Sequence, residues 1–386
     1  MPAIYIHIPF CKQKCKYCDF NSFAGFGAIH DTYIDALIRE IETQAPLLAG
    51  NPVDTVFFGG GTPTLLKPEH ISRITAALRS RFEIAGEAEI SIEANPETIT
   101  GDVLERLLNS GINRLSVGFQ ALDDELLQLI GRKHTAQQAV DAFYRARKAG
   151  FENINIDLIS GLPGQTLAHW AVTLEQAASL EPEHLSCYSL TVEPRTPLER
   201  EIQCGLISVP DDDVQADMLL YTMDSLEESG FIHYEISNYA KPGKECRHNL
   251  VYWKYGDYLG LGAGAHSKIG NKRFRNIAEP NEYIQAVGSP VVQDHAALAA
   301  TVSVVEEQTE LSSTEMMSET MFLGLRLLSG VDLGEFEDHF GISVRDVYGP
   351  QVDELVEKGL VGLSDNTLKL TKKGLLLGNE VFARFV

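Results

Sequence analysis

The chain has 386 residues, of which 44% are hydrophobic and 22% charged, as in an ordinary soluble globular protein. This length is typical of one large domain with an appendage, or of two domains. The formal net charge of −22 argues against non-specific binding to nucleic acid or anionic lipid, so an anionic ligand would need a local basic pocket.

The first residues, MPAIYIHIPF, contain neither the basic segment nor the small-residue cleavage site of a signal peptide. No apolar run approaches the roughly 20 residues that span a bilayer. We therefore expect a cytoplasmic protein in a reducing compartment, without nucleic acid as a partner. In such a compartment, clustered cysteines bind metal or do redox work more often than they form disulfides.

Short runs rich in β-branched residues alternate with amphipathic stretches over the first half of the chain. Thr100 and Thr135 are typical helix N-caps, and Gly111 and Gly150 are typical of helix ends. Repeated strand–helix units predict a parallel β/α sheet or barrel. The expected strands are 3–8, 55–60, 88–94, 114–119, 153–159 and 184–190, and the expected helices between them are 32–45, 68–82, 100–111, 135–150 and 166–180.

Polar and cysteine residues follow the expected strands. Three cysteines between residues 11 and 18 follow the first strand, glycines and Thr62 follow the second, Glu93 ends the third, and Gln120 follows the fourth. Asp157 lies within the fifth strand. Parallel β/α folds build their ligand sites at the carboxyl ends of the strands. The pattern therefore predicts one composite site.

The alternation fades after about residue 200, where residues 210–231 predict a single long helix. The end of the chain predicts two helices around a short hairpin, LVGLSDNTLKLT, which resembles a winged helix. In so acidic a chain, this unit is expected to pack or interact rather than to read DNA. We expect three parts: a core barrel over 1–235, a linking segment over 236–310 that closes the barrel, and a mainly helical domain over 311–386.

Cys11, Cys15 and Cys18 have the spacing C-x3-C-x2-C, and Phe20 stands where a fourth cysteine would follow. Thiolates are soft ligands that suit zinc, copper(I) or iron–sulfur clusters, and a structural zinc site normally needs four ligands. Three thiolates on one tight loop instead fit a cubane 4Fe–4S cluster with one iron open to a small molecule. The alternative is three reduced structural cysteines, but such cysteines are usually scattered in a core. These lie among lysines.

The cysteine spacing with aromatic Tyr17 before the last cysteine resembles the signature of radical S-adenosylmethionine (SAM) enzymes. The motifs YIHIPFC, FFGGGTPT, SIEANPE, SVGFQ, NIDLISGLPGQT and HNLVYW extend this likeness over the whole chain, which resembles the oxygen-independent coproporphyrinogen III oxidase family. The resemblance implies an incomplete (β/α)6 radical SAM barrel with a 4Fe–4S cluster on Cys11, Cys15 and Cys18, and SAM at the open iron.

The resemblance also implies a set of SAM-binding residues. Glycines 59 to 61 would let backbone amides approach SAM, Glu93 would accept from its ammonium, Arg132 would pair with its carboxylate and Asp157 would bind its ribose. Taken singly, the same residues also suit a turn, a solvated strand end or a helix-surface charge. The positions that match are Tyr5, Tyr17, Gly60, Gly61, Thr62, Glu93, Gln120, Arg132, Asp157 and Thr191.

Two departures separate the chain from the decarboxylating oxidases of that family. The oxidases carry a fourth cysteine at the position of Phe20, and an N-terminal extension before the first strand, whereas this chain starts at Met1. Both departures from the oxidases are features of a branch of heme chaperones within that family. The expected function is binding heme and transferring it to a respiratory membrane protein. The alternative is radical decarboxylation of coproporphyrinogen III to protoporphyrinogen IX. Whether the protein is an enzyme, and with which catalytic residues, stays open.

The HNLVYW motif is associated with heme in that branch. His248 and His266 are imidazoles able to ligate heme iron, and Tyr252 and Trp253 could stack on a porphyrin. The alternative is that these residues close the barrel as core residues. Cys246 is a further candidate ligand, whereas Cys187 and Cys204 are expected in the core. Downstream, Lys268, Lys272, Arg273 and Arg275 would suit heme propionates or a solvated hairpin.

The resemblance implies further partners. They are heme, a heme-accepting respiratory protein of the membrane, and an electron donor such as a flavodoxin or ferredoxin. A homodimer is left open, as is peripheral association with the membrane through a partner.

Overall fold

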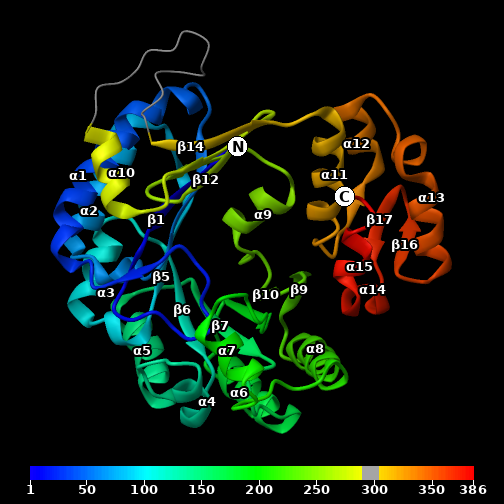
Figure 1. Cartoon of the computed structure of the whole chain (residues 1–386), viewed down its shortest axis with the longest axis horizontal. Coiled ribbons are helices and arrows are strands. Elements are labelled where there is room, and N and C mark those ends of the chain that lie inside the picture. Colours follow the sequence, from blue (N-terminus) through cyan, green and yellow to red (C-terminus); the bar gives the residue numbers. More distant parts are fainter. Residues whose placement is uncertain (289–303) are drawn as a thin grey trace.

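The computed structural model describes residues 1–288 and 304–386 (Figure 1). Part of the expected linking segment, 289–303, therefore lies outside the described residues. Within the described ranges, no helix has the length and apolar character that a membrane crossing requires.

In the described residues, a twelve-stranded sheet organises the larger part of the chain, and six neighbouring parallel strands from the first half of the chain lie near its centre (Figure 1). This confirms the predicted α/β class. The central strands are β1 (Ala3–Ile8), β4 (Val53–Gly60), β5 (Ile84–Ala94), β6 (Arg114–Gln120), β7 (Ile154–Ser160) and β8 (His184–Ser189). The helices that follow them in the chain are α1 (His30–Gln44), α2 (Pro68–Arg81), α3 (Gly101–Asn109), α4 (Asp124–Leu129), α5 (Ala136–Ala149), α6 (Leu167–Ser179), α7 (Pro197–Gln203) and α8 (Asp212–Glu228).

The predicted strands and helices of this half agree with the structure to within a few residues. Thr135 caps α5 with a reciprocal bond to Gln138, and Gly150 ends the same helix in the left-handed conformation at φ 109°. The short helices α4 and α7 have too few turns to show a periodic pattern, and the sequence did not predict them. β1 pairs with parallel strands on both edges, and its side chains are buried on both faces, as is usual for a strand inside a parallel β/α sheet.

The segment after α8 adds strands to both edges of the sheet. β10 (Asn238–Ala240) and β9 (Ile232–Glu235) extend it beyond β8, and β11 (Tyr258–Leu261) pairs in parallel with β1. The expected linking segment is thus largely part of the same sheet. Its remaining elements are α9 (Arg247–Trp253), β12 (His266–Ile269), β13 (Lys272–Asn276), α10 (Pro280–Gly288) and β14 (Val305–Glu310), while β2 (Phe10–Cys11) and β3 (Phe23–Ala24) form a small separate pair near the start of the chain.

The C-terminal part has its own apolar core, in which Phe336, Tyr348, Leu368 and Phe385 are buried. The predicted hairpin is confirmed, with Asp365 and its neighbour Asn366 at the positive φ angles that a two-residue turn requires. The winged-helix resemblance stays a prediction. The elements are α11 (Ser313–Gly324), β15 (Val331–Asp332), α12 (Leu333–Phe340), α13 (Val344–Glu357), β16 (Val361–Ser364), β17 (Thr367–Leu370), α14 (Lys372–Leu376) and α15 (Gly378–Phe382).

A buried carboxyl group joins α1 to the added strands. Glu40 is 1% exposed and accepts hydrogen bonds from the backbone N–H of Gly262 at 2.8 Å, from Asn276 at 2.6 Å and from the Tyr283 hydroxyl at 2.6 Å. Burial raises the pKa of Glu40 from 4.5 to about 7, although the three donors oppose the shift.

Glu40→Gln tests this group through the pH dependence of stability. Because the folded-state pKa of Glu40 is raised, the protonated carboxyl group contributes fully to the free energy of unfolding below about pH 4.5. This contribution is lost as the pH rises through 7. The unfolding free energy of the parent, relative to the variant, should therefore fall by about 3 kcal/mol across this window. Anaerobic urea titrations at several pH values measure it. Glu42→Gln, on the same helix but half-exposed, is the control. Parallel pH curves for the parent and Glu40→Gln would contradict the assignment.

Candidate functional site

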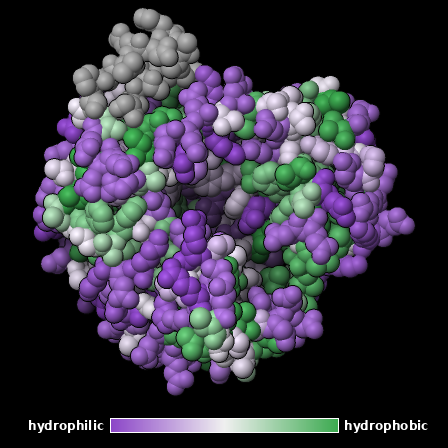
Figure 2. Space-filling model, in the orientation of Figure 1, coloured by the Kyte–Doolittle hydropathy of each residue, from purple (hydrophilic) through white to green (hydrophobic). Residues whose placement is uncertain are grey.

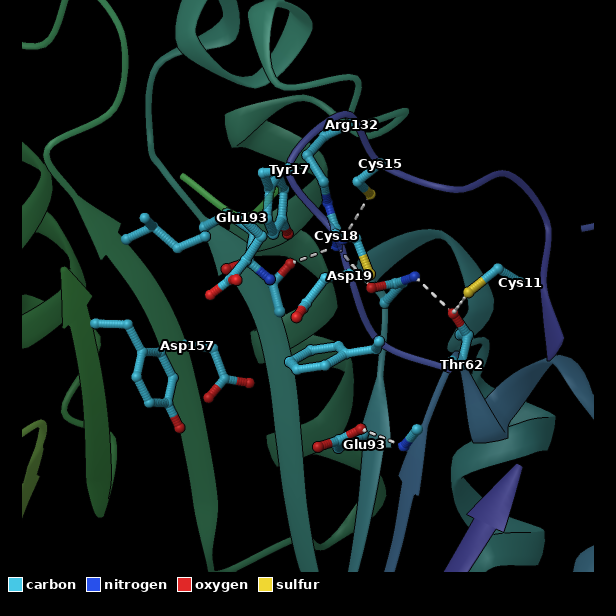
Figure 3. A pocket seen from close by; sticks show the side chains of 18 of the residues that line it. Cys11, Cys15, Tyr17, Cys18, Asp19, Thr62, Glu93, Arg132, Asp157 and Glu193 are labelled. Atoms are coloured by element: carbon cyan, nitrogen blue, oxygen red, sulfur yellow. Dashed lines mark hydrogen bonds between the residues drawn. The ribbon is translucent and has the colours of Figure 1, made fainter. Parts of the chain in front are cut away.

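The three clustered cysteines lie at the carboxyl end of β1 and line one cavity of about 340 Å³ (Figure 3). Cys11, Cys15 and Cys18 are all free and half-buried. Their loop carries no regular structure after Cys11 except the turn in which Cys18 N–H donates to Cys15 C=O at 3.3 Å.

Other segments hold this loop through backbone hydrogen bonds. The N–H of Gly61 donates to Ile8 C=O at 2.8 Å, and the N–H of Thr62 donates to Phe10 C=O at 2.8 Å. The second half of the loop is held at Lys16, which donates to Ile130 C=O at 3.1 Å and accepts from the N–H of Leu198 at 3.0 Å. The cysteines are therefore positioned by the turn after β4, by the end of α4 and by the start of α7.

The glycines after β4 allow a closer approach than any side chain would. Gly60 has φ 115°, and a Cβ there would lie 2.6 Å from the His7 ring. A Cβ on Gly61 would lie 2.6 Å from the carbonyl oxygen of Phe10 and 3.0 Å from the sulfur of Cys11. These glycines let two loops of the protein pack together. The sequence predicted their approach to a ligand or a turn, but not this close packing between two loops.

Two carboxyl groups face the same cavity from β5 and β7. Glu93 accepts a hydrogen bond from Gly60 N–H at 3.1 Å, and its pKa is raised to about 8 by burial and then by repulsion from Asp157. Burial also raises the pKa of Asp157, which accepts from Ser116 at 2.9 Å and from Asn155 at 2.7 Å. A cationic or hydroxyl-bearing ligand would compensate this repulsion between buried carboxyl groups.

Arg132 reaches the cysteine loop from the other side of the cavity. Its guanidinium donates to the Cys15 sulfur at 3.6 Å, to the Asn95 side chain at 2.6 Å and to Gly118 C=O at 2.9 Å. At the end of β6, Gln120 has φ 68°, a left-handed conformation that strains a residue with a side chain and is frequent at functional sites.

The structure brings together the predicted SAM residues with one exception. All of them except Tyr5 line the cysteine cavity, and Tyr5 lines a neighbouring cavity. Sequence reasoning missed several lining residues. Asn95, Gly118 and Ile159 lie inside the motifs SIEANPE, SVGFQ and NIDLISGLPGQT, so their position gave a signal. Tyr188 and Glu193 lie outside the quoted motifs and gave none. The predicted residues that line the cavity are Tyr17, Gly60, Gly61, Thr62, Glu93, Gln120, Arg132, Asp157 and Thr191.

The donor chemistry of the loop suits an iron–sulfur cluster, because thiolates are the ligands that hold such clusters. In the described parts of the chain, no three His, Cys, Asp or Glu side chains are grouped around a point that could hold one metal ion. In a cubane each thiolate binds a different iron, so the three sulfurs stand further apart than the ligands of one ion do. Three free thiols around one cavity suit that requirement.

A second cavity of about 600 Å³ adjoins the first and shares Phe20, Gly60 and Glu93 with it. Figure 2 shows the face of the molecule hollowed at its centre, beside the C-terminal domain. The side chain of His266 is exposed at this cavity. Further lining residues are Tyr5, Asn21, Tyr252, Trp253, Tyr255, Tyr258, Lys268, Arg273 and Leu323.

His248 is not at the second cavity. It is 1% exposed, Nδ1 is 2.9 Å from the Thr55 hydroxyl and Nε2 is 2.9 Å from the Tyr252 hydroxyl. Burial lowers its pKa to about 3. Cys246 is equally buried, beside Glu89. This geometry favours the alternative that His248 is a core residue, because both ring nitrogens already have partners.

Three of the four basic residues after His266 already have acidic partners. Lys268 lies 3.2 Å from Asp257, and Arg273 makes two bonds of 2.7 and 2.8 Å to Glu319 of α11. Arg275 pairs with Glu306 and Glu307. These contacts favour a structural role over propionate binding. Cys187 is buried as expected, but the expectation for Cys204 was wrong, because this cysteine follows α7 at the surface and is exposed.

The fold and the cysteine cavity define a protein of the radical SAM class. The family model described as the radical SAM superfamily matches residues 5–177, and the HemN C-terminal domain matches residues 311–377. The solved structure of coproporphyrinogen III oxidase (HemN) from Escherichia coli, described as a radical SAM enzyme, is similar with a TM-score of 0.84 and 30% identity. That similarity covers 100% of this chain and 90% of the other.

Curated relatives narrow the family further. The chain is 39% identical to the heme chaperone HemW of Bacillus subtilis over 100% of its own length and 99% of the relative. It is 35% identical to the heme chaperone HemW of Escherichia coli, over 100% of this chain and 98% of that protein. The chain belongs to the HemW family of radical SAM proteins. Membership of the radical SAM family implies a 4Fe–4S cluster and SAM.

Gly60→Ala tests whether the turn after β4 positions SAM. The variant combines an unfavourable φ with a clash against the His7 ring, so the turn or this ring must move. We expect SAM affinity to fall by about tenfold or more, measured by calorimetry on the anaerobically reconstituted protein. Gly27→Ala is the control, because its Cβ meets open space. An unchanged SAM dissociation constant in correctly folded Gly60→Ala would contradict the prediction.

Proposed function

We propose that the protein is a heme chaperone that binds heme and transfers it to a respiratory membrane protein. The observation that supports this most directly is the second cavity, which is rich in aromatic side chains, has His266 at its surface, and adjoins the cysteine cavity. Its volume of about 600 Å³ is in the range of cofactor sites, roughly 300–1,000 Å³. The names of the curated relatives agree with this proposal.

In the first cavity, Cys11, Cys15 and Cys18 would hold the 4Fe–4S cluster. When bound, the cluster supplies an electron to the sulfonium of SAM, which is the chemistry of radical SAM proteins. Glu93 would bind the SAM ammonium, and this contact would offset the burial that now raises the pKa of Glu93. Arg132 would pair with the SAM carboxylate through donors that its three protein contacts leave free, and Asp157 would bind ribose hydroxyls.

In the second cavity, His266 would hold the heme iron in this proposal. Its side chain is exposed, and Tyr252, Trp253 and Tyr258 offer aromatic surface for the porphyrin. His248 supports the cavity from beneath, since it shares a hydrogen bond with the Tyr252 hydroxyl. The HNLVYW motif would thus contribute its aromatic residues to heme binding, whereas its histidine acts as a core residue.

The second candidate function is decarboxylation of coproporphyrinogen III. The similarity to the structure of HemN favours it, because that similarity extends over the whole of this chain. Phe20 counts against it. This side chain is 64% exposed and lines both cavities, at a position where the oxidases carry a cysteine.

The heme recipient would be a membrane protein, and an electron donor such as a flavodoxin or ferredoxin would reduce the cluster. In this proposal the protein works in the cytoplasm and reaches the membrane through its recipient. A homodimer is one form in which it could do so.

Heme titrations of His266→Ala and His248→Ala test the heme site. His266→Ala should shift or abolish the Soret band and weaken heme binding, with iron–sulfur content unchanged, because the axial ligand is removed. His248→Ala, the matched control, should keep the parent spectrum and lose about 2–4 kcal/mol of stability, because its removal leaves the buried Thr55 hydroxyl and the partly buried Tyr252 hydroxyl without their partner. The parent heme spectrum and affinity in His266→Ala would overturn the assignment.

An anaerobic assay separates the two functions. The protein is incubated with reductant, SAM and coproporphyrinogen III, and the products are separated by chromatography. We expect no multiple-turnover formation of vinyl groups, while heme binding measured on the same preparation is retained. Multiple turnovers to protoporphyrinogen IX would replace the chaperone function with the oxidase function.

A further inference from the structure

Asn95 joins two hydrogen-bond donors that reach two different cysteines. Its Nδ2 donates to the Thr62 hydroxyl at 3.0 Å, and Thr62 in turn donates to the Cys11 sulfur at 3.8 Å. Its Oδ1 accepts from Arg132 at 2.6 Å, and Arg132 donates to the Cys15 sulfur at 3.6 Å. Figure 3 shows Thr62 directed toward Cys11 and Arg132 toward Cys15.

Arg132 fixes which group donates and which accepts in each hydrogen bond of this network. A guanidinium has donors only, so the amide oxygen of Asn95 must face it. The amide NH2 group then faces Thr62, whose oxygen accepts one of its protons. The hydroxyl of Thr62 has a single proton, which this arrangement leaves directed at Cys11. An asparagine at position 95 therefore keeps a donor on each of the two sulfurs.

The backbone of Asn95 is held independently of this network. β5 ends at Ala94, and the C=O of Asn95 accepts from the N–H of Thr98 at 2.9 Å and from its hydroxyl at 2.7 Å. The following residue, Pro96, favours the extended conformation seen at Asn95, with φ −97° and ψ 146°. The side chain is therefore directed toward the cavity by a rigid turn.

We propose that Asn95 is a positioning residue that raises the reduction potential of the cluster by orienting Thr62 and Arg132 toward the thiolates of Cys11 and Cys15. Hydrogen bonds to cluster sulfurs stabilise the more negative, reduced form and so raise the potential. The inference rests on the proposed ligation of the cluster by these cysteines. It is independent of heme.

The test is a redox titration of the reconstituted cluster without SAM, monitored by EPR, which gives its midpoint potential. It compares the parent, Asn95→Ala, Thr62→Val and the double variant. Both single variants should have more negative potentials than the parent. The shift in the double variant should be smaller than the sum of the single shifts, because Asn95 acts partly through the proton of Thr62. Gln13→Ala is the control, since Gln13 lines the same cavity and its side chain makes no hydrogen bond to a cysteine within 1–288 and 304–386. It should keep the parent potential.

Asn95→Asp provides a second test with an isosteric side chain that still accepts from Arg132. A carboxylate accepts from both neighbours, so the Thr62 proton turns away from Cys11. Asn95→Asp should lower the midpoint potential more when it is introduced into the parent than when it is introduced into Thr62→Val. In Thr62→Val only the added negative charge acts, because there is no hydroxyl proton to turn. Equal shifts in both backgrounds, or a parent potential in Asn95→Ala with full iron content, would overturn the proposal. A parent protein without four irons per chain would overturn it together with the cluster, whereas failure of heme binding would leave it standing.

Discussion

The loop that carries Cys11, Cys15 and Cys18 is held in place by backbone hydrogen bonds from distant segments. Gly61 and Thr62 bind the first half, and Ile130 and Leu198 bind the second. The loop itself has too few internal bonds to keep three thiols around one cavity. The site therefore depends on the parallel sheet, which brings the turn after β4 and the end of α4 to the same edge as the end of β1.

The same edge concentrates buried charge in a chain that is acidic throughout. Repulsion from Asp157 adds to the burial that raises the pKa of Glu93, and the almost fully buried Arg114 of β6 partly opposes the rise in the pKa of both carboxyl groups. The repulsion is tolerated because the surrounding strands supply donors such as Ser116 and Asn155. Such an arrangement is suited to a ligand that carries a positive group, which relieves the repulsion on binding.

The two cavities are in contact through Phe20, Gly60 and Glu93, so a ligand in one is close to the other. The second cavity also depends on the C-terminal domain. Leu323 of α11 lines it, Glu319 of the same helix binds Arg273, and the Arg326 guanidinium lies 4.3 Å from the centre of the Trp253 ring system. This domain is therefore part of the wall around the proposed heme site.

The sequence by itself determined the parallel β/α order, the bounds of β1 and of β4 to β8 with most of the helices between them, and a set of residues at the carboxyl ends of these strands. These features are local, because periodicity, caps and turn residues act within one element. The resemblance to a known family also pointed to nine residues that line the cysteine cavity, and the parallel strands bring them together because these strands end at one edge.

Only the tertiary structure decided between residues of the same type in different surroundings. In the sequence, His248 and His266 have the same candidate role. In the structure, both ring nitrogens of His248 have hydrogen-bond partners, Thr55 and Tyr252, whereas His266 is exposed at a cavity. The role of Asn95 likewise depends on Thr62 and Arg132, which lie 33 and 37 residues away from it along the chain. Burial and hydrogen-bond partners come from such distant contacts, and no local pattern records them.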